Sequence, residues 1–514
     1  MAVYIFNLLV GYVIGGVDHV QGYRVLLLKD FPHPVKYIFT NVPRRREIYL
    51  YKNLGISVDQ MLSMHQYFLD NCTLEATENA KDKAVELKDR LQCSDIIYQD
   101  EEIKLFKDGY VVVTILLNKM NPKNFFEINY FCQAKLVRTE FYTKGIIYAN
   151  YYVTAQSDNG LYAKVVRRTF YDKNGSVAYE QIWRGDEERY LFPDGRMYTK
   201  AQFELEFIKR LNLNLSEKDI VFLDYGTEYE SFAQVLFQFG GKARIMVFFH
   251  SGHYFDKWED PGYHLYLSWE YLYWFKYSNR IDTMLVSTPE QKVELIEKLE
   301  EYKRSVPNVE VIPVSGLDQL RYPIQERKRY SLITVSRIHP RKKIDWIIRS
   351  IIKAHKKNPN IFIDIYGENE GKHYYQYLQD IVSSNNAQSY VRFMGYMDVT
   401  EAYRDYEVYI SASLRETFGL SLMEAVGSGT AMIGLDVKYG NRLFIQPEKN
   451  GYLIDYDRKY AEGDDSKLID DMAEKIVEIF ADEERLERFH RASYEIGKGF
   501  STRLIEKKWK DLLM

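Results

Sequence analysis

The sequence has few cysteines and no long apolar run, and both absences exclude classes of protein. Three cysteines occur in 514 residues, Cys72, Cys93 and Cys132, without C-x-x-C spacing and without the even set that a disulfide framework needs. No window reaches the roughly 18 uninterrupted apolar residues of a spanning helix. The apolar start MAVYIFNLLVGYVIGG lacks a basic segment, which argues against a signal peptide. We therefore expect a cytoplasmic protein with at most peripheral membrane association.

An excess of charge of one sign is also missing. The net charge of −4 argues against a protein that binds nucleic acid or another polyanion over its whole surface, although local basic patches stay possible. A hydrophobic fraction of 46% and a charged fraction of 28% are typical of a globular protein. Tyrosine is abundant, with 44 residues, which reflects either genome composition or stacking platforms for sugars or peptides.

The length predicts about three structural units. Residues 1–74 and 212–324 alternate apolar strand segments with helices, as in a Rossmann-like domain, and a GxxxGG-like turn at Gly11, Gly15 and Gly16 follows the first strand. That turn indicates either a phosphate- or sugar-facing loop or close strand–helix packing. Residues 325–498 form a second Rossmann-like unit, and 499–514 form an amphipathic helix.

Residues 75–211 have a different sequence pattern. Segments such as YVVVTILL, GIIYANYYVTAQ and LYAKVVRRTFY alternate with turn signals such as KDG, SDNG and PDG. Period-two patterning of this kind predicts an antiparallel meander, so we expect a β-rich insertion in the first α/β domain. An exposed edge of the meander is suited to pairing with another chain or an extended peptide, and the alternative is a decoration that only stabilises the fold.

The run SASLRETFGLSLMEAVGSGT contains two glutamates, Glu416 and Glu424, on either side of a predicted strand–loop–helix junction. The first N–H groups of a helix lack backbone partners and favour negative charge, so this junction is suited to an anion. Arg337 and Lys342 follow another strand, in SRIHPRKKID, and are placed to clamp a diphosphate. The alternative is a solvated basic run.

Two histidines, His250 and His253, follow a strand of the first domain in VFFHSGHYF. They are candidates for contacts to a substrate hydroxyl rather than for a metal site, because no third ligand lies nearby in sequence.

The D-x-D at Asp455 and Asp457 follows a strand far from the basic pair and is interpreted as a polar loop.

Together these residues resemble a retaining glycosyltransferase of the GT-B fold, and more closely the GtfA family, the catalytic subunits of GtfA–GtfB enzymes of Gram-positive bacteria. The resemblance covers nearly the whole chain and is most specific over residues 330–455. The segments that support it are NLLVGYVIGGVDHVQGYR, FFHSGHYF, TVSRIHPRKKIDWI, DIYGENEG, YISASLRETFGLSLMEAVGSG and LDVKYGNRLFIQPEKNGYLI. It implies two Rossmann-like domains facing a nucleotide-sugar cleft, with the final helix returning to the first domain.

The resemblance also implies roles for individual residues. Arg337 and Lys342 neutralise the UDP diphosphate without a metal ion, and the Gly16 N–H lies near the β-phosphate. Glu424 accepts the ribose hydroxyls, and Glu416 lies by the sugar as a catalytic residue. The remaining implied contacts are His253 and His250 at the donor sugar, backbone N–H groups of Phe418, Gly419 and Leu420, and a uracil border of Tyr366, Gly367, Met394, Gly395 and Tyr396.

The implied reaction transfers N-acetylglucosamine from UDP-GlcNAc to Ser or Thr of a serine-rich repeat adhesin before export, with a GtfB-like co-subunit joined through the β-rich insertion. No cofactor is expected, and UDP-glucose remains an alternative donor. Two other functions stay open. One is a non-catalytic, adhesin-binding GT-B subunit, and the other is a wall teichoic acid glycosyltransferase, for which the basic run KVVRR (164–168) is a signal.

Overall fold

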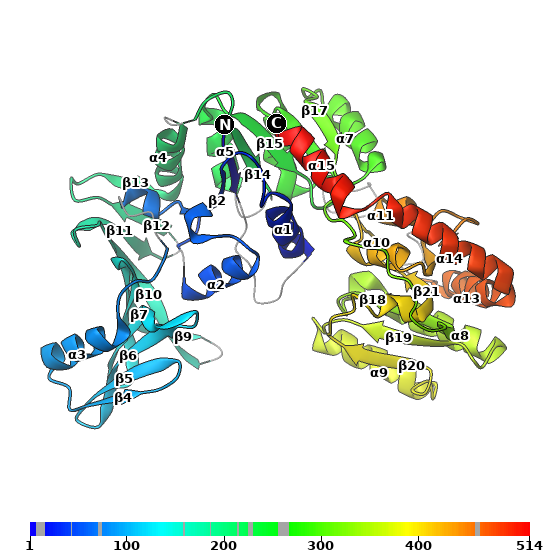
Figure 1. Cartoon of the computed structure of the whole chain (residues 1–514), viewed down its shortest axis with the longest axis horizontal. Coiled ribbons are helices and arrows are strands. Elements are labelled where there is room, and N and C mark those ends of the chain that lie inside the picture. Colours follow the sequence, from blue (N-terminus) through cyan, green and yellow to red (C-terminus); the bar gives the residue numbers. More distant parts are fainter. Residues whose placement is uncertain are drawn as a thin grey trace. The chain divides into compact units, whose positions relative to one another are not determined.

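The computed structural model describes residues 1–6, 16–42, 44–69, 74–157, 160–185, 187–212, 215–224, 230–254, 267–457 and 463–514. The chain packs as two compact units. One comprises Met1–Val247 and Arg280–Asp282, and the other comprises Phe248–Asn279 and Thr283–Met514. The described strands form three sheets, of seven, ten and six strands (Figure 1).

The first sheet is parallel, and its strand order is β17-β16-β15-β14-β1-β2-β3. β1 lies in its interior, with Val3 opposite both Ile220 and Val35. The strands are β1 (Val3–Phe6), β2 (Val35–Phe39), β3 (Met61–Ser63), β14 (Ile220–Leu223), β15 (Arg244–Phe248), β16 (Thr283–Val286) and β17 (Asn308–Val311). The associated helices are α1 (Gly16–Leu27), α2 (Arg45–Asn53), α5 (Glu230–Phe239), α6 (Leu272–Lys276) and α7 (Pro289–Glu301). The fully buried strands β14 and β16 are continuous apolar or β-branched runs, as parallel sheets covered on both faces require.

The ten-stranded sheet is an antiparallel meander in which every strand pairs with its neighbour in sequence. The turn between its second and third strands, β5 and β6, is a two-residue connection in which Asp108 and Gly109 have φ of 51° and 78°, the type I′ geometry that the KDG signal predicts. The strands are β4 (Asp95–Tyr98), β5 (Glu102–Lys107), β6 (Tyr110–Asn118), β7 (Asn121–Cys132), β8 (Lys135–Thr143), β9 (Gly145–Ser157), β10 (Gly160–Tyr171), β11 (Val177–Arg184), β12 (Glu187–Leu191) and β13 (Met197–Thr199). The predicted β-rich insertion is therefore present.

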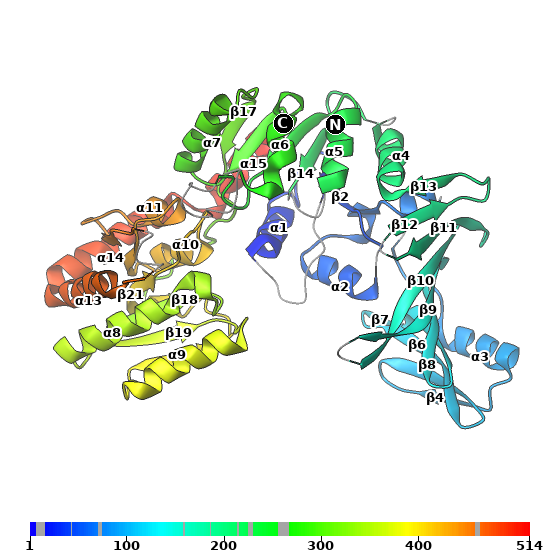
Figure 2. The ribbon, with the colours of Figure 1, turned by 180° about the vertical axis from the view of Figure 1, so that it is seen from behind.

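Helix α3 (Ala80–Leu91) covers one end of the meander (Figure 1, Figure 2). The side chain of Asn79 accepts hydrogen bonds from the N–H groups of Lys81 and Asp82 and so starts the helix. Leu87 is fully buried in a core cluster with Ile115 and other strand residues. The insertion therefore has a hydrophobic core of its own.

A buried aromatic cluster joins the meander to the segment after β3. His65 lies at its centre, stacked on Phe170 of β10 with 5.2 Å between ring centroids, and its Nδ1 is 2.9 Å from the Tyr179 hydroxyl of β11. Phe203 of α4 (Lys200–Asn212) packs on the same ring at 5.6 Å. Burial lowers the pKa of His65 to about 3, so the imidazole is neutral at pH 7.

We expect this histidine to make folding stability sensitive to acid. The pKa is lower in the folded chain than the unfolded value near 6.5, so folding favours the neutral ring, and stability present above pH 6.5 is lost as the pH falls toward 3. By pH 5 the loss from His65 amounts to roughly 2 kcal/mol. His65→Phe should reduce the difference between urea midpoints at pH 7 and pH 5, because a phenyl ring does not titrate. The Tyr179 hydroxyl keeps a partner in this variant, since it can still donate to the carbonyl of residue 65. An unchanged difference would contradict the assignment.

The six-stranded sheet is parallel, in the order β20-β19-β18-β21-β22-β23, which reads 3-2-1-4-5-6 along the chain. This is the order of dinucleotide-binding sheets, and its two central strands, β18 and β21, mark the point where the order reverses. The strands are β18 (Lys328–Val335), β19 (Phe362–Tyr366), β20 (Val391–Gly395), β21 (Tyr406–Ser411), β22 (Ala431–Leu435) and β23 (Gly451–Ile454). The helices are α8 (Ile344–Lys357), α9 (Lys372–Ser384), α10 (Leu420–Gly427), α11 (Gly440–Phe444), α13 (Ser466–Ala481), α14 (Glu483–Lys498) and α15 (Thr502–Leu513).

The amphipathic tail is helix α15, as predicted. It buries Ile505, Trp509 and Leu513, and the Trp509 ring stacks on Phe248 at the end of β15 with 6.1 Å between centroids. Of the helices that the structure describes, none combines the length and the apolar character needed to cross a bilayer. The division of the chain into five sequence segments stays a prediction.

Candidate active site

The loops that follow three neighbouring strands of the six-stranded sheet are joined by backbone hydrogen bonds. The N–H of Ser336, after β18, donates to the carbonyl of Tyr366 at 3.0 Å, and the N–H of Gly367 donates to Gly395 at 2.9 Å. Gly367 has φ of 151°, and a Cβ there would lie 1.8 Å from the Ser336 oxygen, so only glycine permits this approach. The loops carrying Arg337, Gly367 and Gly395 therefore lie side by side at the carboxyl edge of the sheet.

Lys342 and Glu416 meet at the point where the strand order reverses. Lys342 ends the short helix η5 (Pro340–Lys342) after β18, and Glu416 follows β21. The lysine Nζ lies 2.5 Å from Oε1 of Glu416, and the two side chains are 21% and 16% exposed. The loops are also joined by the Leu414 N–H, which donates to the Arg341 carbonyl at 3.2 Å. The structure thus brings together one residue from each of the two predicted pairs.

Arg337 has a different carboxylate partner. Its Nη1 lies 2.8 Å from Oε1 of Glu370 in the loop after β19, and the arginine side chain is 61% exposed. Glu370 was not among the predicted site residues. It lies in the GENEG run, where nothing distinguishes it from Glu368 in sequence. Both predicted phosphate-binding cations are therefore held by carboxylates in this structure.

The predicted anion-binding helix is α10. Gly419, its N-cap, has φ of 89° and carries no side chain that could cap the first N–H groups of the helix. The loop before it is held by the Glu416 carbonyl, which accepts hydrogen bonds from the N–H groups of Tyr439 and Gly440, both at 2.7 Å. A helix start with a glycine N-cap, four residues after the Glu416 that pairs with Lys342, is suited to a phosphate.

Glu424 lies one turn into α10. Its Oε2 accepts a hydrogen bond from the Tyr403 hydroxyl at 2.9 Å. Burial raises the pKa of Glu424, and the hydrogen bond from Tyr403 opposes that shift. The carboxylate is thus oriented by a tyrosine that the sequence did not single out.

The two histidines differ in environment. His253 has no exposed surface, and its ring contacts Phe249 edge-on and stacks on Phe275. Burial lowers the pKa of His253 to about 4, so the ring is neutral at pH 7. Within the described part of the chain, neither ring nitrogen has a hydrogen-bond partner. His250 is half-buried and stacks on Phe248 with 4.6 Å between centroids.

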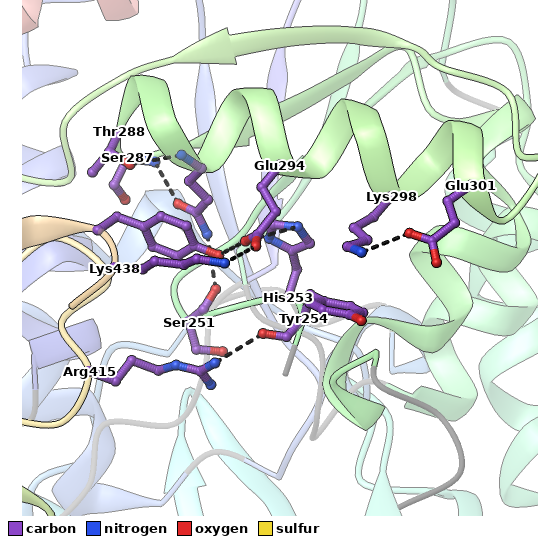
Figure 3. A network of polar contacts seen from close by, with 12 residues as sticks. Ser251, His253, Tyr254, Ser287, Thr288, Glu294, Lys298, Glu301, Arg415 and Lys438 are labelled. Atoms are coloured by element: carbon purple, nitrogen blue, oxygen red, sulfur yellow. Dashed lines mark hydrogen bonds and ion pairs between the residues drawn. The ribbon is translucent and has the colours of Figure 1, made fainter. Parts of the chain in front are cut away.

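A polar network that sequence reasoning missed surrounds His253 (Figure 3). Glu294 of α7 lies 3.9 Å from His253 Nε2 and 2.5 Å from Lys438 Nζ, and it accepts a hydrogen bond from the Tyr439 hydroxyl. Arg415, next to Glu416, donates to the Tyr254 carbonyl at 3.0 Å. These residues come from α7, from the segment after β15 and from the loops after β21 and β22, so no local pattern marks them as a group.

The other predicted residues have varied surroundings. The Tyr366 side chain is buried, and its hydroxyl lies 2.9 Å from that of Tyr406, which leaves mainly its backbone for a ligand. Met394 and Tyr396 are exposed. Phe418 is buried against Phe444 and Phe500, which is consistent with a role for its backbone only.

Gly16 is the first residue of α1, and Gly11 and Gly15 lie outside the described residues. Asp455 and Asp457 follow β23 without regular structure. In the described ranges, no group of three or more His, Cys, Asp or Glu side chains is arranged to hold a metal ion. The ligand contacts assigned to these residues stay predictions.

Two family models match separate parts of the chain. The family model for glycosyl transferases group 1 matches residues 320–496, and the GtfA extended beta-sheet domain matches residues 97–194. The chain is 32% identical over 519 residues to the UDP-N-acetylglucosamine–peptide N-acetylglucosaminyltransferase GtfA subunit of Streptococcus gordonii, covering 100% of this chain and 98% of that protein.

Two solved structures are also similar over their full lengths. The pneumococcal O-GlcNAc transferase GtfA in complex with UDP and GlcNAc has a TM-score of 0.81 at 31% identity, with 100% of this chain and 98% of that chain covered. A GtfA/B complex has a TM-score of 0.85 at 30% identity, with 100% and 99% covered. The predicted fold class, two Rossmann-like sheets of the GT-B type with an antiparallel insertion, is confirmed.

A wall-polymer enzyme is a more distant relative. The poly(ribitol-phosphate) alpha-N-acetylglucosaminyltransferase of Staphylococcus aureus is 26% identical over 238 residues, which cover 46% of this chain and 44% of that protein. The match to the GtfA subunit thus has higher identity and extends over the whole chain, whereas the match to this wall-polymer enzyme covers less than half of it. The chain belongs to the GtfA family of UDP-N-acetylglucosamine–peptide N-acetylglucosaminyltransferase subunits.

Proposed function

We propose that this chain is a retaining glycosyltransferase that moves N-acetylglucosamine from UDP-GlcNAc to Ser or Thr side chains of a serine-rich repeat adhesin. The main structural support is the Lys342–Glu416 pair in the loops after β18 and β21, just before the glycine-capped start of α10, at the point where the order of the six-stranded sheet reverses. The GtfA relatives act on a peptide with UDP-GlcNAc, according to their names. The active-site pair also favours a catalytic over a non-catalytic subunit.

Lys342 and Arg337 are proposed to bind the diphosphate. In the structure each cation pairs with a carboxylate, Glu416 for Lys342 and Glu370 for Arg337. When a diphosphate arrives, its charge replaces these partners, and the α10 N–H groups donate to its oxygens. Because the bond to UDP breaks in the reaction, this charge stabilisation grows in the transition state and accelerates the chemical step.

The acids and histidines are proposed to act on hydroxyls. Glu416, released from Lys342, lies by the sugar, and Glu424 accepts from the ribose. His253 is neutral at pH 7, so its ring can donate one hydrogen bond and accept another at the donor sugar. Retention follows when the departing UDP oxygen takes the proton of the acceptor hydroxyl on the same face of the sugar, which requires no protein nucleophile.

The ribose contact gives a separable prediction. Glu424→Gln removes the charged acceptor, while the ribose stays unchanged during the reaction, so the contact is equal in ground and transition states. The KM for UDP-GlcNAc should rise about tenfold with kcat within about threefold. Steady-state UDP release measures both constants, and Glu495→Gln on the exposed face of α14 is the control. A lower kcat with unchanged KM would place Glu424 at the reaction centre instead.

The β-rich insertion is proposed to hold the GtfB-type partner and to help bind the acceptor. The solved GtfA/B complex supports such a partner for its own GtfA chain. The edge strand β4 exposes Ile97 and Tyr98, which suits it to strand pairing with another chain.

We also propose a cytoplasmic location, with peripheral contact to the inner face of the membrane.

One observation weighs against the wall teichoic acid alternative. In KVVRR, the half-buried Arg168 donates to Asn150 and Gln181, and the exposed Arg167 lies over the Tyr151 ring. Two of the three cations of this run thus have partners within the insertion, whereas a polyanionic acceptor requires a basic groove.

The test combines both donors, the acceptor and the partner. The purified chain, with and without a GtfB-type partner, is incubated with UDP-GlcNAc or UDP-glucose and a Ser/Thr-rich peptide. We expect UDP release with a peptide mass gain of N-acetylhexosamine, and a larger gain when the partner is present. Donor hydrolysis with no gain in peptide mass under any condition would contradict the proposal.

A further inference from the structure

Glu294 is the meeting point of three chain segments that lie far apart in sequence (Figure 3). It projects from α7 toward Lys438 of the loop after β22 and toward His253 of the segment after β15. The Lys438 Nζ is 2.5 Å from Oε1, and the Tyr439 hydroxyl donates to Oε2. Both carboxylate oxygens of Glu294 therefore bind neighbouring residues of one loop.

The carboxylate is ionised at neutral pH. Burial alone would raise the pKa of Glu294, but the hydrogen bonds from Lys438 and Tyr439 and the charge of Lys438 outweigh it and hold the pKa below its usual range. The Glu294 side chain is 12% exposed, so this pair is screened less than a surface ion pair. Charge-assisted bonds in such surroundings hold a fixed geometry.

The loop that Glu294 holds also holds Glu416. The N–H groups of Tyr439 and Gly440 both donate to the Glu416 carbonyl at 2.7 Å. A Cβ on Gly440 would lie 1.9 Å from the Phe418 carbonyl, so the two loops pack backbone to backbone. Direct contacts therefore run from Glu294 through residues 438–440 to Glu416, and from Glu416 to Lys342.

A second set of contacts fixes the same region from the side of His253. Arg415 donates to the Tyr254 carbonyl, and its guanidinium lies 3.2 Å from where a Cβ on Gly252 would stand. Gln291, one turn before Glu294 on α7, donates to the Ser251 carbonyl at 3.1 Å. The α7 helix thus contacts both the loop of residues 438–440 and the segment that carries His253.

We propose that Glu294 is a positioning residue for the transfer reaction, which ties residues 438–440 to α7 and so sets the geometry of Glu416, Lys342 and His253. This inference rests on the proposed function. Among the described donor-binding candidates, His253 is the one with a recorded contact to Glu294, with 3.9 Å between its Nε2 and the carboxylate. Glu294 therefore acts through the groups that it holds in place. Displacing reacting groups by about 1 Å is enough to cost about a hundredfold in rate.

The test is a kinetic comparison of Glu294→Ala, Glu294→Asp and Glu294→Gln with the parent chain, with its partner present. We expect Glu294→Ala to lower kcat about 10- to 100-fold while the KM for UDP-GlcNAc changes less than about threefold, because a displacement of about 1 Å weakens contacts in the transition state more than binding of the donor in the ground state. Glu294→Asp keeps the charge and should recover part of kcat, and Glu294→Gln should recover less. Glu297→Ala, an exposed position three residues along α7, is the matched control.

A double-mutant cycle with Tyr439→Phe separates positioning from folding. If Glu294 acts through this loop, Glu294→Ala should lower kcat less in the Tyr439→Phe background than in the parent. If the two substitutions only reduce the folded fraction independently, their effects on kcat, expressed as free energies, should add. Equal kcat values for parent and Glu294→Ala, or additive effects in the cycle, would overturn the inference. Lack of transfer by the parent chain itself would instead count against the proposed function.

Discussion

Lys342→Ala should lower kcat for GlcNAc transfer about 10²- to 10³-fold while the protein stays folded. The lysine forms an ion pair with Glu416, and the proposed reaction develops negative charge on the departing UDP, which Lys342 stabilises most in the transition state. Its removal should change stability little, because a partly exposed ion pair contributes about 0–1 kcal/mol. Peptide mass gain over time at saturating UDP-GlcNAc measures the effect.

The control for this variant is Lys353→Ala. Lys353 lies on α8 of the same unit, 2.6 Å from Asp470, and both side chains are largely exposed. It removes an equal charge without approaching the proposed diphosphate site, so its kcat should match the parent. A folded Lys342→Ala protein with near-parent turnover would refute the role assigned to the lysine.

Arg327→Ala should lower the unfolding temperature of the second unit by about 6–20 °C, which corresponds to about 3–5 kcal/mol. The half-buried Arg327 guanidinium donates to the carbonyls of Arg404 and Tyr406 at 2.9 and 2.6 Å, and to the Ser428 carbonyl at 2.7 Å. It also donates to the Tyr494 hydroxyl at 3.1 Å. Alanine leaves several of these acceptors without a donor, at about 1–3 kcal/mol for each that stays buried.

Arg329→Ala is the matched control for the stability change. Arg329 lies two residues further along the chain and forms a 3.4 Å ion pair with Glu483, with both side chains mostly exposed. Its loss should cost less than about 1 kcal/mol. Differential scanning calorimetry of both variants gives the comparison, and a transition of Arg327→Ala within about 2 °C of the parent would show that the carbonyl contacts contribute little.

The fold was predictable because its signals are local. Alternation of apolar residues and turn signals such as KDG act over a few residues, and they specify strands and hairpins directly. The meeting of Lys342 and Glu416, 74 residues apart, was also predictable, because the carboxyl ends of adjacent parallel strands share one edge of a sheet. General topology was enough for that inference.

The partners of these residues were not predictable in the same way. Glu370 lies 33 residues from Arg337, and Glu294 lies 144 residues from Lys438. Their pairing depends on how α7 and the loops pack, which no short pattern encodes. Tyr366 shows a related limit, since the sequence places it at a strand end but does not tell that its hydroxyl points to Tyr406 in the interior. A contact between Tyr366 and the uracil stays a prediction, and it would be made by the backbone of Tyr366 rather than by its side chain.

The position of β1 inside the first sheet affects how the chain folds during synthesis. β1 pairs with β14, and the Ala2 N–H bonds Asp219, 217 residues later. At about 5–20 residues per second, a ribosome needs about 10–40 s to make that stretch. The meander, whose strands pair with their sequence neighbours, can form in this interval, while β1 has β2 but not yet β14 as a neighbour. The insertion is therefore expected to fold before the domain that contains it, and the β1 edge that later pairs with β14 is exposed to aggregation during synthesis.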